Sequence, residues 1–336
     1  MAYTYDAAGN RLTAKQTGDT TSSQTLTYNA VGQITSTGYA YDGVGNLTAA
    51  PEETFTYNDA QQLTASTKNG VTTRYEYAGA DMNKLLKQST DGGAEYDYTY
   101  GTSDQNGVPV ITSRTVAGTG TASVISDPTT GQPMDLQTTD GVTSMWVIDG
   151  IGNPAAAIAD TGGTAYTVSY DPYGGESVAT GGTSAQWLQN PYGFKTGVRS
   201  SSTDNGLTKF GYRWQSSITG GWLQRDTLDA PLSPTDANRY AYAGADSING
   251  HDATGNLSSF GTYASQCALG ATTSFGIGLA LGTSYTPATA LGEVAVGCAI
   301  NVGTQYISDT VSVGAGNGVA YGDFLLTVGK IAKAVR

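Results

Sequence analysis

The sequence predicts a mainly β protein, and three observations carry that prediction. A short phrase, Tyr-x-Tyr-Asp-x-x-Gly-Asn, stands at residues 3–10 and returns with small changes along the chain. The composition suits short strands and tight turns, with 22 Tyr and 46 Gly among 336 residues. Before about residue 260 the chain lacks the sustained 3.6-residue periodicity of amphipathic helices. Repetition on this scale predicts an extended array in which each unit packs on the next.

Each copy of the phrase predicts a β-hairpin. Aromatic residues two apart, such as Tyr3 and Tyr5, would point to one face of a strand. Asp or Asn then opens a turn, and Gly three residues later can adopt the left-handed conformation that leads into the second strand. Asp6, Asp42 and Asp149 are therefore predicted to form turns and not to act as ligands or catalysts. Further copies, some degraded, stand at residues 26–34, 39–47, 55–58, 75–77, 148–153 and 170–174.

Changes in composition divide the chain into three parts. Residues 1–182 are the hairpin strip, with a less regular stretch at 102–145 where Gly and Pro punctuate short strands. Residues 183–257 form a denser block that holds three of the four Trp. Residues 258–336 are rich in Ala and Gly, and we expect a small mixed or helical segment there, with a short helix near 323–333.

Charge and rare residues exclude several functions. The net charge of −12 and a pI near 4.3 argue against nucleic-acid binding by residues 1–257, because that needs clustered Lys and Arg. The single histidine, His251, rules out metal sites with two or more His, and its loop-like surroundings predict a solvated residue. No cofactor or metal site is predicted. Cys267 and Cys298 fit either a disulfide or two buried apolar side chains.

Signals for targeting are missing from the sequence. No apolar run has the length of a membrane-spanning helix, and residues 1–20 carry no signal peptide. Because the first repeat begins two residues after Met1, we expect the chain to be a fragment or to start within an array.

Residues 187–257 carry an ordered series of motifs. The series contains Asn-Pro-Tyr-Gly-Phe at 190–194, Tyr-Arg-Trp at 212–214, Gly-Gly-Trp-Leu-Gln-Arg-Asp at 220–226, Asn-Arg-Tyr at 238–240 and Asp-Ala-Thr-Gly at 252–255. It resembles the core domain of RHS/YD-repeat proteins, and the hairpin phrase resembles the YD repeat itself. The resemblance covers roughly residues 3–257.

This resemblance implies a fold and a function. A strip of hairpins would spiral into a hollow shell, here a partial β-cocoon, closed by the core domain. In such families the shell encloses a variable C-terminal segment, often a toxin, which the protein cuts free inside. The chain would then be secreted or lie at the cell surface. Its partners would be its own C-terminal segment as cargo and a longer YD-repeat array or a component of a secretion system.

The resemblance also implies candidate catalytic residues. Asp226 and Asp252 match the family's aspartate pair, and Arg213 matches the arginine beside them. Close carboxylates do not both ionise cheaply, so one can hold a proton while the other activates water, in a single-turnover aspartic-type autoprotease. In structural terms, the aspartates could equally form turns and the arginine an ion pair. The residues of the expected cut are Asn256, Leu257 and Ser258.

The chain departs from the family pattern at several of these positions. Thr227 and Ala253 stand where Pro usually follows each aspartate, Trp214 replaces the usual Tyr after the arginine, and Leu is commonest at the position of Asn256.

A second hypothesis is a cell-surface adhesion or carbohydrate-binding module, because exposed aromatic residues on β-hairpins stack well on sugars. The orientation of the tyrosines separates the two hypotheses. An inner wall made by Tyr5, Tyr41 and Tyr57 favours the shell, and an aromatic groove facing solvent favours the adhesin. For the tail, a small membrane-acting cargo and a linker or truncated cargo are both open. Glu293 and Asp309 could form a hydrolase pair, although no motif supports one.

Overall fold

The structure is a computed structural model that describes residues 1–17, 21–202, 204–227 and 237–256. These residues belong to one compact unit, which extends from Met1 to Ser258. The expected helix near residue 323 and both cysteines lie outside the described residues. None of the helices described is long and apolar enough to cross a membrane.

Most of the strip forms one antiparallel sheet of 14 strands whose neighbours in space are also neighbours in sequence. This meander is open, since β4 and β17 are its two edges. Its strands are β4 (Ala40–Tyr41), β5 (Leu47–Ala50), β6 (Glu53–Tyr57), β7 (Leu63–Lys68), β8 (Val71–Ala78), β9 (Asp81–Thr90), β10 (Glu95–Ser103), β11 (Pro109–Val116), β12 (Gly120–Ser126), β13 (Pro133–Gln137), β14 (Thr143–Ile148), β15 (Pro154–Ala159), β16 (Thr164–Tyr170) and β17 (Glu176–Thr180). A separate sheet holds β1 (Ala2–Tyr5), β2 (Arg11–Gln16) and β3 (Ser22–Thr25).

The turn chemistry predicted from the repeat is confirmed. The Gly9 N–H donates to the Asp6 carbonyl at 3.1 Å, and Gly9 has φ +76°, the left-handed region. The Asp6 carboxylate accepts the Asn10 backbone N–H at 2.9 Å and its side-chain amide at 2.8 Å. The same hydrogen bonds recur at residues 42–46 and 149–153. The turn aspartates are therefore fully engaged in holding the hairpins.

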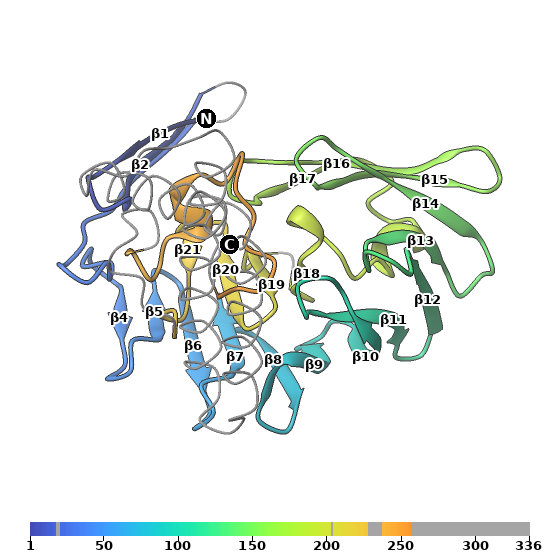
Figure 1. Ribbon diagram of the computed structural model, residues 1–336, viewed down its shortest axis with the longest axis horizontal. Helices are drawn as coiled ribbons and strands as arrows, with labels where there is room; N and C mark the ends of the chain where they lie inside the picture. The colour runs from blue at the N-terminus through green and yellow to red at the C-terminus, as the bar shows by residue number, and fades with distance from the viewer. Residues whose placement is uncertain (18–20, 203, 228–236, 257–336) are drawn as a thin grey trace, which may run out of the picture. The chain divides into compact units, whose positions relative to one another are not determined.

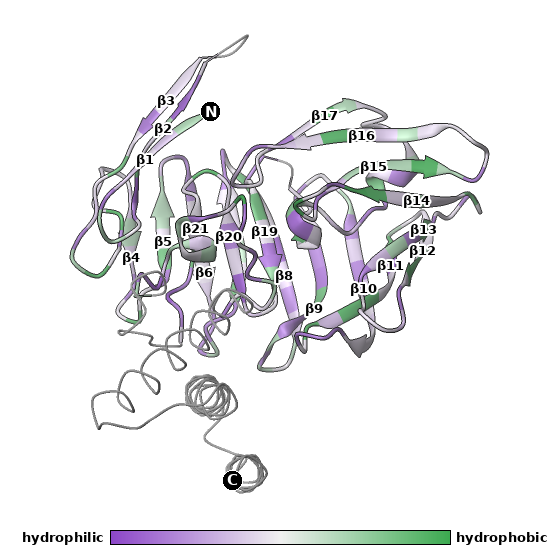
Figure 2. Ribbon diagram, turned by 45° about the horizontal axis from the view of Figure 1, so that its top comes forward, coloured by the Kyte–Doolittle hydropathy of each residue, from purple (hydrophilic) through white to green (hydrophobic). Residues whose placement is uncertain are grey.

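One face of the large sheet is buried. In β6, Phe55 is buried while Thr54 and Thr56 are exposed, so burial alternates with the pleat. Figure 2 shows the resulting mixture of hydrophilic and hydrophobic segments along the strands. Aliphatic residues of the returning strands supply much of the buried face. They include Leu47, Leu63, Leu85, Ile111 and Leu136.

The stretch at 102–145 is more regular than the sequence suggested. Strands β10 to β14 cover most of it and continue the same sheet without a break in strand order. The turns of this stretch lack the full repeat phrase, yet Asp104 and Asp127 still accept backbone N–H groups two to four residues on. Short polar turns are sufficient to close these hairpins.

Residues after the strip form a core that packs inside the bend of the sheet (Figure 1). Its elements are α1 (Ala185–Leu188), η1 (Phe194–Thr196), β18 (Val198–Arg199), β19 (Leu207–Phe210), β20 (Arg213–Ser216), β21 (Gly221–Trp222) and η2 (Tyr242–Ala245). The contact is largely aromatic. The Trp214 and Tyr75 ring centroids are 4.5 Å apart, and those of Trp187 and Tyr166 are 5.0 Å apart. The core therefore closes over the buried face, as the resemblance implied.

Polar side chains of the sheet also bind the core backbone. Arg114 is buried and donates to the Asn190 carbonyl at 2.7 Å, with its guanidinium 3.5 Å from the Tyr96 ring centroid. Gln88 donates to the Arg199 carbonyl at 3.0 Å and accepts the Ser201 N–H at 2.7 Å. Since buried polar groups are costly when unpaired, these bonds also fix the register of core on sheet.

The orientation of the tyrosines agrees with the shell hypothesis at two of three positions. Tyr41 and Tyr57 are half-buried and pack against the main core. The Tyr57 hydroxyl donates to the Leu47 carbonyl at 2.9 Å. Tyr5 differs, because it is 39% exposed and shares a hydrogen bond of 2.8 Å with the Tyr173 hydroxyl. Tyr5 therefore does not contribute to an inner wall of the large sheet, because it belongs to the separate three-stranded sheet.

Candidate functional site: a buried arginine between two aspartates

Three parts of the core bring the predicted site residues together. Arg213 begins β20, Asp226 follows β21 by four residues, and Asp252 lies in the loop after η2. One guanidinium nitrogen, Nη2, donates to Asp226 Oδ2 at 2.6 Å and to Asp252 Oδ2 at 3.3 Å. We call Arg213, Asp226 and Asp252 the ion triad.

The ion triad is almost completely withdrawn from solvent. The side chains of Arg213, Asp226 and Asp252 are 4%, 8% and 2% exposed. Charges in such a place need partners, and the guanidinium finds further ones in the backbone. Its Nη1 donates to the Arg239 carbonyl at 3.1 Å and its Nε donates to the Gly255 carbonyl. The arginine therefore links both aspartates and the loop after Asp252.

The Asp252 carboxylate also accepts hydrogen bonds from the residues that follow it in the chain. Its Oδ1 accepts the Thr254 hydroxyl at 3.1 Å and the Asn256 backbone N–H at 3.2 Å. These bonds form an Asx-type turn, so the turn role considered for Asp252 is present. The same carboxylate thus contacts Arg213 through one oxygen and the chain just before the expected cut through the other.

Close backbone contacts hold this loop against the β19–β20 turn. The Tyr212 N–H donates to the Thr254 carbonyl at 2.8 Å. Gly255 has φ +68°, and a Cβ there would collide with the Phe210 carbonyl oxygen. A side chain at Gly255 would therefore separate the loop from the turn, and with it Asp252 from Arg213.

Two aromatic residues complete the surroundings of the ion triad. The Arg213 guanidinium lies 4.2 Å from the Trp222 ring centroid, a cation–π contact. Burial raises the pKa of the Tyr242 hydroxyl well above its usual range, and the Asp252 charge adds to the increase. Tyr242 therefore stays neutral beside the negative charge.

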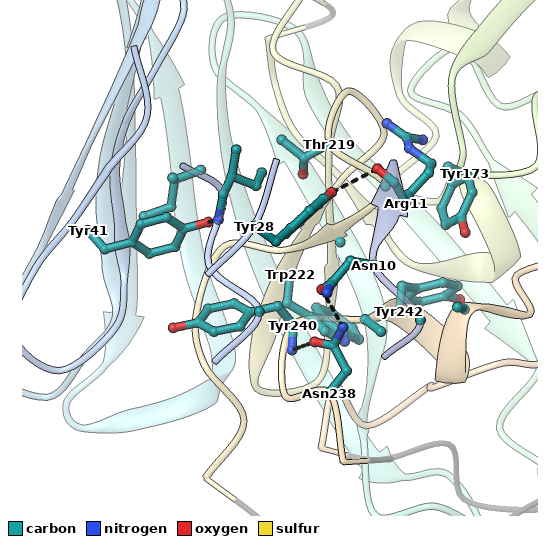
Figure 3. A pocket seen from close by; sticks show the side chains of 18 residues that line it. Asn10, Arg11, Tyr28, Tyr41, Tyr173, Thr219, Trp222, Asn238, Tyr240 and Tyr242 are labelled. Carbon is teal, nitrogen blue, oxygen red and sulfur yellow. Dashed lines mark hydrogen bonds between the residues drawn. The ribbon is translucent and has the colours of Figure 1, made fainter. Parts of the chain in front are cut away.

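A small cavity shares Trp222 with the ion triad (Figure 3). Its volume of 30 Å³ can hold about two water molecules, at roughly 10–15 Å³ each. The first hairpin and the core both line it, and Asn238 joins them by donating to Asn10 Oδ1 at 2.7 Å. Trp222 Nε1 is buried and has no hydrogen-bond partner among the described residues. The Trp222 side chain would separate water in this space from the Arg213 guanidinium.

Sequence reasoning found part of this site. Arg213, Asp226 and Asp252 are brought together, and Asn256 is buried beside them. Leu257 and Ser258 lie outside the described residues. Reasoning from sequence missed Arg239, whose Nε donates to the Asp226 carbonyl at 2.8 Å and whose own carbonyl accepts the Asp226 N–H. Only its place in the Asn-Arg-Tyr motif could have suggested this role.

His251 takes no part in the ion triad. It is exposed in its loop, in keeping with the expected solvated residue, and its ring packs edge-on against Phe210 at 5.8 Å between centroids. Within the ranges described, no group of three His, Cys, Asp or Glu side chains is arranged to hold a metal ion.

The meander of hairpins and the core packed on its buried face define the class of protein, an RHS/YD-repeat shell. Comparison with known families makes this specific. The family model described as Teneurin YD-shell matches residues 1–248, and the chain belongs to this family.

Solved structures share the fold. The crystal structure of TcdB2-TccC3-Cdc42 covers 75% of this chain with a TM-score of 0.56 and 16% identity, over 13% of its own chain. The Photorhabdus luminescens Tc holotoxin pore, with the TccC3-D651A mutation, covers 77% with a TM-score of 0.52 and 17% identity, also over 13% of its own chain. At these identities the likeness is one of fold.

A curated relative is more similar in sequence over a shorter stretch. The tRNA nuclease WapA of Bacillus subtilis (strain 168) is 31% identical over 132 residues. The match takes in 31% of this chain and 6% of the nuclease. The chain therefore corresponds to a small part of each of these larger proteins.

Proposed function

We propose that the chain is the shell and core component of a secreted polymorphic toxin, and that it releases its C-terminal segment by cutting itself. Residues 1–182 supply the shell strip, 183–257 the core with its protease centre, and 258–336 the released segment. The cut falls at Asn256, Leu257 or Ser258. Membership of the YD-shell family and a fold shared with proteins titled as Tc toxins support this proposal.

One observation carries the proposal most directly. Arg213 bridges two buried carboxylates, and one of them, Asp252, also accepts the Asn256 N–H at 3.2 Å. Turn formation by the two aspartates does not by itself account for the buried cation that they share. Asp252 is therefore in reach of Asn256, the first of the residues at which the cut is proposed.

The chemistry follows from the residue types. One carboxylate accepts a proton from a water molecule while the oxygen of that water attacks the peptide carbonyl carbon. The other carboxyl group donates a proton to the nitrogen of the leaving amide. The guanidinium keeps the accepting carboxylate ionised. The cavity beside Trp222 can supply the water. Because the substrate is the chain itself, each molecule reacts once.

The enclosing shell needs more strands than this chain has. The large sheet is open at β4 and β17, so full enclosure of the segment would require further YD repeats or a partner protein. The adhesin hypothesis has less support, since Tyr41 and Tyr57 are packed inside and do not line a groove open to a sugar. It predicts binding to a glycan array, which the shell hypothesis does not.

The test is intact mass and gel analysis of the purified chain beside Asp226→Asn and Asp252→Asn. These substitutions keep the shape of each side chain and remove its capacity for proton transfer. We expect the wild type to yield two products that meet between residues 256 and 258, and both variants to stay whole. Asp149→Asn, which alters a turn aspartate far from the ion triad, serves as the matched control and should be cut like the wild type.

Two results would overturn the proposal. An uncut wild type after prolonged incubation would leave the ion triad as a scaffold. Cutting at the same place in both aspartate variants would assign the cleavage to another protease.

A further inference from the structure

A second, larger cavity lies away from the cavity of Figure 3. Its volume is 330 Å³, and it opens between two hairpin turns of the sheet and the core. The turns contribute residues 104–106, 108–111 and 130–133, and the core contributes Tyr192, residues 195–198 and 209–211, His251 and Ala253. Tyr100, Tyr192 and Phe210 give it aromatic walls. A space of this size exceeds that of a few ordered waters.

Two buried lysines line this cavity, although the chain as a whole is acidic. Lys195 is 2% exposed and Lys209 is 3% exposed. Among the residues the structure describes, no carboxylate oxygen lies within 4.0 Å of either ammonium nitrogen. Lys209 donates to the Gly211 carbonyl, and Lys195 donates to the carbonyls of residues 248 and 250. A buried ammonium bound only to neutral carbonyls is a costly arrangement that an anion would relieve.

A polar atom on the sheet side of the cavity also lacks a partner. Asn83 lines the cavity, and its buried Oδ1 has no hydrogen-bond partner in the part of the chain described. A half-turn of the amide group exchanges oxygen for nitrogen, so Asn83 can present two N–H donors to an acceptor. Lys209 thus offers an ammonium group from the core, and Asn83 offers two N–H donors from β9 once its amide is turned.

We propose that this cavity is a binding site for a small oxyanion, a sulfate, phosphate or carboxylate group, held by Lys209 and Asn83. The aromatic walls accommodate an apolar body attached to that group. The proposal does not rest on the proposed cleavage, although His251 and Ala253 of the lining stand on either side of Asp252. It is local, because a net charge of −12 gives the surface as a whole no attraction for anions.

The charges around Lys209 give the site a characteristic pH dependence. Burial lowers the pKa of Lys209 to about 7, and the Asp81 charge partly offsets this. Lys195, Asp104 and His251 also line the cavity; partial desolvation and the Lys195 charge lower the pKa of the exposed His251 from its usual 6.5, so it is neutral above pH 7. The nearby phenols have raised pKa values and stay neutral too; they are those of Tyr77, Tyr100 and Tyr192. Anion affinity should therefore follow the protonation of Lys209.

Isothermal titration calorimetry of the full chain with sulfate tests the proposal, because the charge of sulfate is constant from pH 6 to pH 9. We expect one saturable site per chain, seen against chloride at matched ionic strength. Above pH 7 the affinity should fall by up to about tenfold per pH unit, as for binding linked to one proton. A parallel titration with acetate distinguishes a site for tetrahedral anions from one for carboxylates.

Variants identify the cavity as the place of binding. Lys209→Met should weaken sulfate binding by at least about tenfold, the loss of one charge-assisted hydrogen bond. Lys15→Met removes the same charge from an exposed position and should bind like the wild type. Asn83→Asp keeps the shape of the side chain, places a negative charge in the cavity and should abolish binding. The proposal is overturned if the wild type shows no saturable site, or if Lys209→Met and Asn83→Asp fold and bind sulfate normally.

Discussion

Arg213 contacts two buried carboxyl groups through one terminal nitrogen, and this sets what its loss would do. Arg213→Met would leave Asp226 and Asp252 buried without their shared cation. We expect the free energy of unfolding to fall by about 3–5 kcal/mol, the usual cost of breaking a buried ion pair. Urea denaturation at pH 7 measures it.

Arg74→Met is the matched control for that experiment. Arg74 pairs with Asp91 at 2.5 Å, but both side chains are about half exposed. Exposed pairs contribute little, so this variant should unfold close to the wild type. Equal losses in the two variants would show that the ion triad contributes no more than a surface pair.

The turn aspartates also contribute to stability through single side chains. Asp42 accepts N–H groups from Val44, Gly45 and Asn46. Asp42→Ala removes this acceptor and should cost about 1 kcal/mol. Asp42→Asn should be nearly neutral at pH 7, because Asn29 and Asn58 already fill the same place in other copies of the turn. Equal stability of the Ala and Asn variants would contradict this account.

The Asp42 turn should also make the stability of the protein depend on pH in the acid range. Burial raises the pKa of Asp42, but hydrogen bonds from Asn46 and its neighbours outweigh it and leave the pKa below its usual value. A carboxyl with a lowered pKa in the folded state stabilises the protein above about pH 4, and this contribution is lost as the pH falls through the folded value. Asp42→Asn should therefore lose less stability than the wild type between pH 5 and pH 3.

Lys209 also makes stability rise with pH, but on the alkaline side. Its pKa falls from 10.5 to about 7 on folding, because burial disfavours the charged form. The unfolded chain thus binds more protons between pH 7 and pH 9, so the wild type should gain stability over that range in an anion-free buffer. Lys209→Met should lack this part of the gain. Parallel stability curves for the two proteins would show that Lys209 titrates normally.

At the scale of elements, the core depends on contacts that join residues distant in sequence. Trp214 is fully buried, packs on Tyr75, and donates from Nε1 to the Tyr77 hydroxyl at 2.8 Å. Trp214→Ala should cost about 3–5 kcal/mol and make residues 183–256 more accessible to limited proteolysis. The control is Leu188→Ala in α1, because the Leu188 side chain is 52% exposed and its loss should change stability little. A stable and protected Trp214 variant would show that the core does not rely on this contact.

At the level of elements, short-range contacts could be predicted from the sequence and long-range contacts could not. The hairpin turns were predictable because their hydrogen bonds join residues at most four apart, as in Asp6 and Asn10. The support of the core by Arg114 and Gln88 was not, because each binds backbone 76 or more residues away. Nothing in the local sequence of either residue marks it as buried. The inner and outer positions of tyrosines likewise depend on which sheet a repeat joins, as Tyr5 illustrates.

The candidate site was predictable to a similar degree. A family resemblance supplied Arg213, Asp226 and Asp252, whose positions in sequence are 13 to 39 residues apart. Their neighbours Arg239 and Trp222 stand in the same series of motifs, but the sequence does not show what they contact, because a cation–π contact and a backbone bond leave no pattern of their own. The cavity lined by Lys209 was invisible for the same reason, since turns and core meet there only in three dimensions.

At the scale of the whole molecule, a meander of hairpins buries one face against a core, and that core contains the ion triad. In this arrangement residues 254–256 stay bound to the core beside Asp252, through Thr254 to Tyr212 and through Asn256 to Asp252 itself. A shell that cuts its own chain should do so without help and at a rate that does not depend on protein concentration.

Intact mass after synthesis of the 336-residue chain in a translation system of purified components tests this claim most directly, because other proteases are absent. We predict that the full-length mass decays to two fragments that meet at residues 256–258. The rate should be the same at two concentrations tenfold apart, and Asp226→Asn should stay whole. A wild-type chain that keeps its full mass, or a cut that accelerates with concentration, would contradict the account.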